Sequence, residues 1–255
     1  MLKHLGIYDR FTDVVVWPDS INLRRWQDGT LLSRTQLHPD MTETYGTPYW
    51  LIHRPDYHHL LHQAALENGC DIRVKSRVAS VDENAPSVAL TNGETIHADI
   101  IVGADGIKSV IRAHILDKPV QPRLYGECAY RATVPAEELL AEPELRRFIE
   151  QPRANCWIGP GRHLMAYPIQ NRTKYNLVMV HPGLAVQDRW NESGDLKEMV
   201  ENFENWDPLL VKVLKKVKEC LKWNLADLPL LDTWRSKSGK VVLIGDASHA
   251  TLPFV

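Results

Sequence analysis

Two short hydrophobic runs, far apart in the chain, each end in a glycine and an aspartate. Asp99–Asp105 reads Asp-Ile-Ile-Val-Gly-Ala-Asp, and Val241–Asp246 reads Val-Val-Leu-Ile-Gly-Asp. Such runs are typical of buried parallel strands, although each motif taken singly is also compatible with a plain turn. Open α/β sheets bind nucleotides at the carboxyl ends of their strands, where glycine admits a ligand and a carboxylate accepts from sugar hydroxyls. The two motifs together predict a nucleotide site.

The spacing changes to that of a helix after Arg54. Apolar residues at positions 57, 60, 61 and 64 recur at i, i+3, i+4 and i+7. Pro55 suits a first helical turn, and Asn68-Gly69 suits a helix end. We therefore expect an amphipathic helix here.

Strand patterns lie on both sides of this helix. Residues 11–52 mix short apolar pieces with turn pairs such as Asp28-Gly29, which predicts an antiparallel meander. Ile72 and Val74 alternate as a further strand. Residues 88–97 form a hairpin pattern around Asn92-Gly93, where glycine supplies a positive φ.

From about residue 116 to 234 the strands read as antiparallel, so this region predicts a second domain inserted into the first. Two helices are expected, over Glu137–Glu150 and Leu196–Lys218. The predicted strands are Cys128–Val134, Asn155–Gly159, His163–Ile169 and Tyr175–Val180.

Composition excludes several classes of partner. The 255 residues hold 30 Lys+Arg against 32 Asp+Glu, so no basic excess favours nucleic acid. No apolar stretch approaches the ~20 residues that cross a membrane, and no signal-peptide core opens the chain. The 4 cysteines lie far apart without C-x-x-C, which favours a reducing compartment. We expect a cytoplasmic protein without a membrane partner; the sequence does not indicate its oligomeric state.

Five segments, in order, resemble the class A flavoprotein monooxygenases, the salicylate hydroxylase-like enzymes with the para-hydroxybenzoate hydroxylase fold. The segments are Ile52–Leu61, Gly103–Arg112, Gly126–Ala132, Trp157–Pro168 and Gly245–Ala250. The resemblance implies FAD and NAD(P)H as cofactors. It also implies hydroxylation of a small aromatic, phenolic or other electron-rich substrate with O2.

The implied fold class is α/β with mixed α+β character: a partial Rossmann-like FAD-binding domain with an inserted antiparallel or mixed-sheet substrate domain. We expect residues 53–115 and 235–255 to form the FAD-binding part and residues 116–234 the substrate domain. Residues 1–52 form the strand meander, which is expected to bridge the two.

The resemblance assigns cofactor contacts to five residues. Arg54 would contact the flavin, and Asp246 with Gly245 the ribityl or pyrophosphate region. Asp105 and Gly106 belong to a motif linked to FAD and to the nicotinamide donor. From residue type alone, Arg54 could instead form a surface salt bridge, and Asp105 could cap a helix at Ser109. Capping and phosphate binding are compatible, because phosphates also bind at helix starts.

The resemblance also assigns catalysis to Arg131 and Tyr167. Strand periodicity places Arg131 on the face opposite Tyr130, where its guanidinium could stabilise a substrate phenolate. Tyr167 shares a face with His163 and could donate to the substrate oxygen or relay its proton. Alternatively, Arg131 pairs with a carboxylate and Tyr167 fills the core. His58 and His62, one helical turn apart, could suggest a metal, but a solvated face is expected and no metal site is predicted.

A family member would begin with a strand and a Gly-x-Gly-x-x-Gly turn for the ADP half of FAD. That unit is absent, and the chain stops before the helix that should follow Asp246. We therefore expect a chain truncated at both ends that holds little FAD when expressed alone. The alternative is a non-catalytic remnant of such an enzyme.

Overall fold

The computed structural model describes residues 1–183 and 191–253. The chain divides into two compact units, residues 1–70 with 127–224 and residues 71–126 with 225–255. The unit bounds differ from the domain ranges expected above, chiefly because the helix after residue 53 belongs to the first unit. The assignment of an FAD-binding part and a substrate domain stays a prediction. The expected ranges include residues 184–190 and 254–255, which lie outside the described residues.

An eight-stranded sheet organises the first unit, in the order β11-β12-β7-β10-β9-β8-β1-β2. Neighbours from β7 to β8 are antiparallel, as predicted, and so are β1 and β2, whereas β1 pairs with β8 in parallel. The strands are β1 (Ser20–Arg25), β2 (Leu31–Gln36), β7 (Arg123–Pro135), β8 (Arg153–Gly159), β9 (Arg162–Ile169), β10 (Lys174–Pro182), β11 (Asn191–Ser193) and β12 (Leu221–Asp227).

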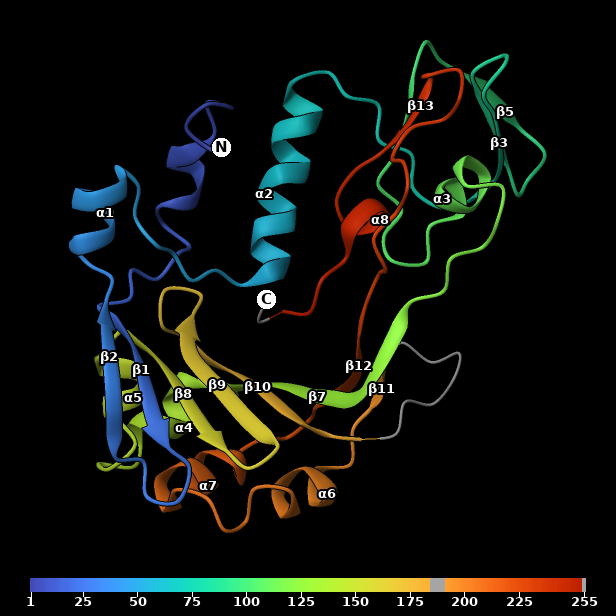
Figure 1. Ribbon diagram of the computed structural model, residues 1–255. Helices are drawn as coiled ribbons and strands as arrows, with labels where there is room; N and C mark the ends of the chain where they lie inside the picture. Colours follow the sequence, from blue (N-terminus) through green and yellow to red (C-terminus); the bar gives the residue numbers. More distant parts are fainter. Residues whose placement is uncertain (184–190, 254–255) are drawn as a thin grey trace. The chain divides into compact units, whose positions relative to one another are not determined.

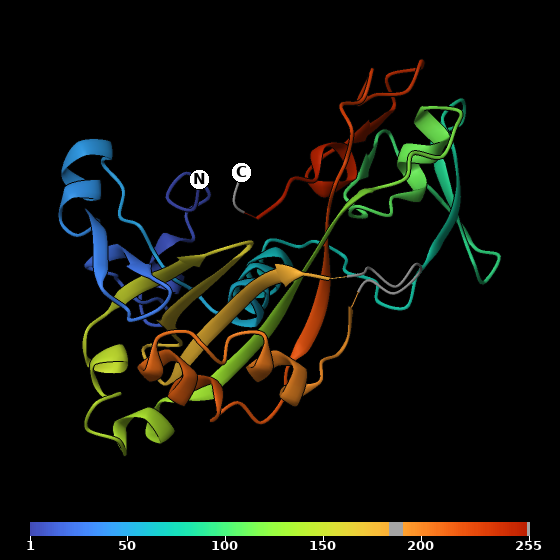
Figure 2. The same cartoon turned by 60° about the horizontal axis from the view of Figure 1, so that its bottom comes forward.

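Four short helices cover one face of this sheet (Figures 1 and 2). They are α4 (Ala136–Leu140), α5 (Arg147–Glu150), α6 (Leu196–Glu201) and α7 (Pro208–Leu214). The two longer helices predicted from sequence are wrong in extent. Pro143 lacks an N–H and interrupts the first, and Asp207 caps a new helix before Pro208 in the second, accepting from the backbone N–H of Leu209.

The predicted helix over residues 54–67 is confirmed as α2 (Arg54–Glu67), with Pro55 in its first turn and Asn68 at its end. It packs on the short helix η1 (Tyr8–Phe11) through Ala64 and Phe11. The helix α1 (Asp40–Tyr45) was not predicted, and the strand expected near residue 16 is a single bridge between Val16 and Leu51.

The second unit pairs the two glycine-aspartate motifs. Strand β6 (Ile101–Gly103) lies parallel to β13 (Val241–Leu243), with Leu243 opposite Gly103. Two short helices follow them, α3 (Val110–Ile115) and α8 (Asp246–His249). The predicted parallel strands are therefore direct neighbours, although more than a hundred residues separate them in the chain.

A three-stranded antiparallel sheet completes the second unit: β3 (Val78–Asp82), β4 (Ser87–Leu90) and β5 (Thr95–His97). The hairpin predicted at Asn92-Gly93 is confirmed, with Gly93 at φ 90°. The strand predicted at Ile72 and Val74 is wrong, because the chain turns at Lys75, which has φ 57°, and the strand forms later.

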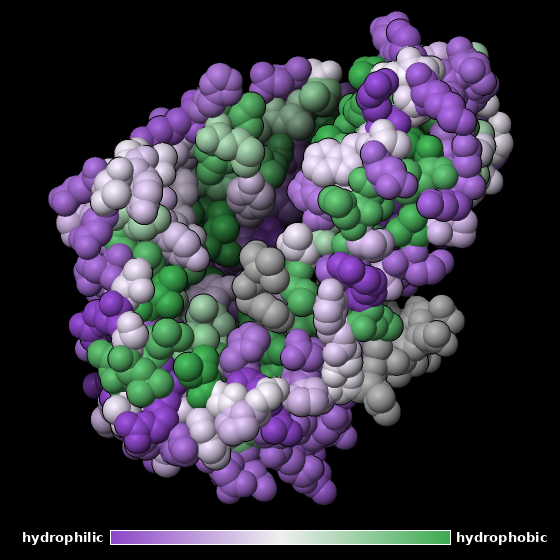
Figure 3. All heavy atoms as spheres, viewed as in Figure 1, coloured by the Kyte–Doolittle hydropathy of each residue, from purple (hydrophilic) through white to green (hydrophobic). Residues whose placement is uncertain are grey.

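The β6–β13 sheet is covered on one face only. Ile101, Val241 and Leu243 pack against Ile111 of α3. On the other face Val102 is 50% exposed, and Ile244, which follows β13, is 51% exposed. On the part of the surface that this unit forms, green apolar side chains lie among white and purple ones in Figure 3.

Candidate functional site

The glycine at the end of β6 serves packing. A Cβ on Gly103 would lie 2.9 Å from side-chain atoms of both Ile111 and Leu243, closer than real contacts allow. The glycine lets helix α3 approach the paired strands. The idea that Gly103 opens the backbone to a ligand is therefore replaced by a structural reason.

Gly106 and Gly245 differ from Gly103, because each has a positive φ, of 78° and 57°, and open space where a Cβ would stand. Both are conformations that favour glycine. Asp246 follows Gly245, is exposed, and has no hydrogen-bond or ion-pair partner among residues 1–183 and 191–253. A free carboxylate beside an open backbone fits the hydroxyl groups of a nucleotide cofactor.

Asp105 caps helix α3. One carboxylate oxygen accepts from the Ser109 hydroxyl at 2.6 Å, and the other accepts from the backbone N–H groups of Val110 and Ile111 at 2.7 and 3.3 Å. The Ser109 hydroxyl oxygen in turn accepts from the backbone N–H of Arg112 at 2.9 Å. The capping role considered from sequence is thus present, and a cofactor role for Asp105 stays a prediction.

Arg112 is the residue that joins the two motifs, a role that the sequence pattern does not indicate. It is 2% exposed, and its guanidinium donates to the backbone carbonyls of Ala247, Ile107 and Val120 at 3.0, 2.5 and 3.3 Å. Burial lowers the pKa of Arg112, while the charge of Asp105 raises it. Arg112 therefore holds α8 and the loop before α3 in one arrangement.

Arg131 and Tyr167 lie in the first unit, on the sheet face that α4–α7 leave uncovered. Tyr130 is fully buried in the core beneath those helices, and Arg131 points to the other face, as predicted. In the register of the sheet, Asn176 of β10 stands opposite both Thr133 of β7 and Tyr167 of β9. Arg131, Asn176 and Tyr167 therefore share one face, in neighbouring rows.

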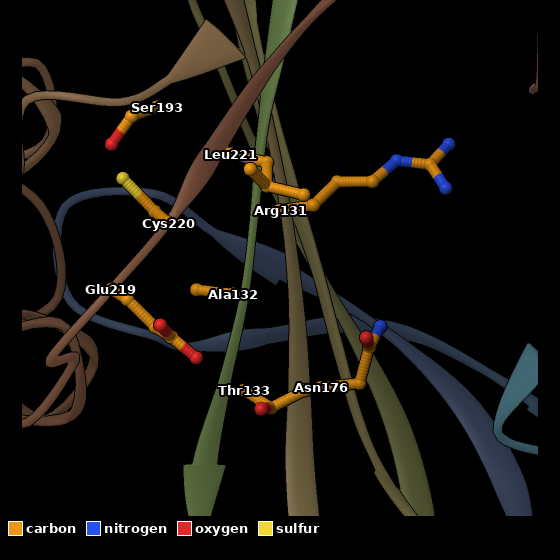
Figure 4. Close-up of a pocket in the computed structure, with 8 residues that line it drawn as sticks. All are labelled: Arg131, Ala132, Thr133, Asn176, Ser193, Glu219, Cys220 and Leu221. Carbon is orange, nitrogen blue, oxygen red and sulfur yellow. The ribbon is translucent and has the colours of Figure 1, made fainter. Parts of the chain in front are cut away.

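A cavity of about 340 Å³ lies beside β7 and is lined by Arg131, Ala132, Thr133, Asn176, Ser193, Glu219, Cys220 and Leu221. In the close-up, Arg131 and Asn176 extend to one side of β7, away from Ser193 and Cys220 (Figure 4). Sequence reasoning missed Asn176, although the alternation within Tyr175–Val180 already placed it on the face opposite Tyr175.

Arg131 is a partly buried cation without a carboxylate partner in the described parts of the chain, so it does not form the ion pair considered from sequence. Its buried Nε has no hydrogen-bond partner in the part of the chain that the structure describes, and its Cζ lies 5.3 Å from the centroid of the Trp223 ring. Burial lowers the pKa of Arg131, the Tyr167 hydroxyl raises it, and the charge of Arg54 lowers it. The guanidinium charge is therefore available to a ligand.

Burial raises the pKa of Tyr167, while the nearby Arg131 charge lowers it. The phenol therefore stays protonated, and its hydroxyl can donate.

Arg54, at the start of α2, is exposed and forms no ion pair within the described residues. Its neighbour Asp56 accepts from Gln170 at 3.3 Å, which ties α2 to the end of β9.

The structure thus brings Arg54, Arg131 and Tyr167 into one unit and Asp105, Gly106, Gly245 and Asp246 into the other.

The rings of His58 and His62 lie 6.3 Å apart. Over the part of the chain that the structure describes, no group of three His, Cys, Asp or Glu residues could hold a metal. In the same part, no helix is both long and apolar enough to cross a bilayer.

Comparison with known proteins gives concordant matches. A family model described as an FAD binding domain matches residues 1–255. The FAD-dependent monooxygenase OpS4 of Beauveria bassiana is 31% identical over the whole chain and 60% of its own length. The 3-amino-4-hydroxybenzoate 2-monooxygenase of Streptomyces cremeus is 32% identical over the whole chain and 61% of its own length.

A solved structure of a salicylate hydroxylase substrate complex matches 99% of this chain and 64% of that protein, with a TM-score of 0.80 and 23% identity. This likeness shows the mixed α/β fold expected from sequence. The chain spans about 60% of the length of the relatives named above.

Proposed function

Because the chain belongs to the FAD-binding domain family, we propose that the full protein is an FAD-dependent monooxygenase that hydroxylates a small aromatic substrate with NAD(P)H and O2. The observation that carries the proposal is Arg131, a partly buried guanidinium without a carboxylate partner among the described residues. It shares a sheet face with the Tyr167 hydroxyl. A cation placed in this way stabilises an anion that comes from outside the protein.

The residues of the second unit fit FAD. The Asp246 carboxylate would accept from hydroxyl groups of the ribityl chain or ribose, and Gly245 and Gly106 admit a close approach of the backbone. Arg54 lies in the first unit, and its expected contact with the flavin stays a prediction. Bound FAD supplies electron transfer and oxygen activation, which amino-acid side chains do not.

The residues of the first unit act on the substrate. The Arg131 guanidinium would stabilise the phenolate oxygen, which makes the aromatic ring electron-rich, and the Tyr167 hydroxyl would donate to the same oxygen. Arg131 brings a positive charge to this region without a carboxylate partner in the described residues. The relative from Streptomyces cremeus is named for 3-amino-4-hydroxybenzoate, a ring that carries a hydroxyl and a carboxylate. We infer a phenolic acid as the substrate class.

The test is turnover by the full-length protein with FAD, NADH or NADPH, and three probes: 4-hydroxybenzoate, phenol and benzoate. We expect hydroxylated product from the phenols, faster with the carboxylated one, and none from benzoate. Product from benzoate alone would contradict the phenolate role. Binding of the probes without any oxidation of NAD(P)H would favour the alternative of a non-catalytic remnant.

Replacing Asp246 by asparagine should weaken FAD binding. The uncharged amide loses a charge-assisted hydrogen bond, so we expect roughly a tenfold or greater rise in the Kd for FAD. Flavin fluorescence quenching on the full-length apoprotein measures this Kd. Asp232→Asn, which changes an exposed carboxylate of the same unit, is the matched control. Equal Kd values for the two variants would remove Asp246 from the cofactor site.

Replacing Tyr167 by phenylalanine should lower product formation by about tenfold, since one hydrogen bond to the substrate oxygen is lost. NAD(P)H oxidation should continue and release hydrogen peroxide, because the change does not touch the cofactor. Product and peroxide are measured together. Tyr45→Phe, at a side chain 69% exposed, serves as the control. Unchanged product from Tyr167→Phe would return this tyrosine to a packing role.

The proposal includes a cytoplasmic location. Its support is the use of NAD(P)H and the four unpaired cysteines, one of which, Cys70, is exposed.

A further inference from the structure

The Arg131 guanidinium rests beside an aromatic ring. Its Cζ lies 5.3 Å from the centroid of the Trp223 ring, within the range of a cation–π interaction. Trp223 is half-buried, and its Nε1 is buried without a hydrogen-bond partner among residues 1–183 and 191–253. The guanidinium of Arg131 is thus a cation that lies over this ring.

Strand β12, which carries Trp223, is anchored through its other face. Lys222 precedes Trp223 and, by strand alternation, points the opposite way. Its ammonium binds the Glu198 carboxylate of α6 at 2.9 Å and lies 5.4 Å over the Tyr130 ring. Because β12 lies next to β7 in the sheet, these contacts fix the Trp223 ring against the strand of Arg131.

We propose that Trp223 is a positioning residue that holds the guanidinium of Arg131 toward an anionic aromatic substrate. The inference rests on the proposed function of Arg131. A carboxylate in the place of Trp223 would also orient the guanidinium, but it would neutralise the charge and compete with the substrate phenolate. An aromatic face attracts the cation without a full opposite charge, so the field at the substrate oxygen is kept.

The ring also restricts a flexible side chain. Arginine loses considerable rotamer freedom when it is ordered, and a guanidinium already ordered by Trp223 loses less when the substrate binds. Preorganisation of this kind should raise the affinity for the anionic form of a phenol. It should change the affinity for the neutral form only slightly.

The test uses the full-length FAD-loaded protein and 4-nitrophenol as the probe, whose bound phenolate is followed by absorbance against pH. We expect Trp223→Leu to weaken phenolate binding by roughly tenfold and Trp223→Phe, which keeps a ring, by less than about threefold. Trp26→Leu, at a half-buried tryptophan that packs on Trp206, is the matched control and should leave phenolate binding unchanged. If Trp223→Leu does not fold, Trp223→Met gives the same comparison.

A double-mutant cycle separates this inference from the proposed function. In the Arg131→Gln background, the effect of Trp223→Leu on phenolate binding should disappear. If it persists, or if Trp26→Leu has an equal effect, Trp223 does not act through Arg131. If Arg131→Gln itself leaves phenolate binding unchanged, the proposed stabilisation of the phenolate by Arg131 is wrong. An effect of Arg131→Gln without one of Trp223→Leu rejects the positioning role alone.

Discussion

Replacing Arg131 by glutamine is expected to lower product formation by roughly 10²-fold or more while FAD stays bound. The guanidinium is held in a partly buried site and has no carboxylate partner in the described chain, so its charge is available to the substrate oxygen. Glutamine keeps much of the length and some hydrogen bonding but removes the charge. The phenolate then loses its main stabilising contact, and the ring becomes a poorer nucleophile.

Product, hydrogen peroxide and bound flavin should be measured on the same preparation of the full-length protein. The Arg131→Gln variant should oxidise NAD(P)H slowly and release peroxide in place of product. Arg34→Gln, at an exposed arginine on β2 of the same sheet, should behave as the wild type. Unchanged product would leave Arg131 with a structural role only, and loss of flavin would assign it to the cofactor or to folding.

Replacing Arg112 by methionine should destabilise the second unit and abolish FAD binding at ordinary cofactor concentrations. Three backbone carbonyls, of Ala247, Ile107 and Val120, lose their guanidinium donor in the interior. Each buried acceptor left without a partner costs about 1–3 kcal/mol, so we expect a loss of roughly 3 kcal/mol or more in the free energy of unfolding. Helix α8, which begins at Asp246, loses its link to the loop before α3.

Urea unfolding and flavin titration of the full-length protein test this expectation. Lys118→Met makes a similar change of an exposed cation to a thioether on the same segment, and it should alter neither quantity. A stable Arg112→Met protein with normal FAD affinity would show that α8 keeps its position without this guanidinium. A stable protein with weakened FAD binding would show that Arg112 orders the site more than it supports the fold.

Local pattern was sufficient for much of this fold. The parallel character of the strands at Ile101 and Val241, the helix from Arg54 to Glu67 and the Asn92-Gly93 hairpin all follow from spacing or turn chemistry over a few residues. The alternation that turns Arg131 away from Tyr130 is also local, because side chains on a strand alternate whatever the rest of the protein does.

Other features depend on residues that meet only after folding. Gly103 is required because Ile111 and Leu243 leave no space for a Cβ, and Arg112 gains its role from a carbonyl 135 residues away. The register of β10 sets Asn176 opposite Tyr167, and β12 brings Trp223 beside Arg131. Spacing along the chain carries no record of such contacts, because they arise from strand order and packing. Local sequence patterns select the residue types proposed for the site, whereas strand order and packing in the folded chain set which of these residues lie together.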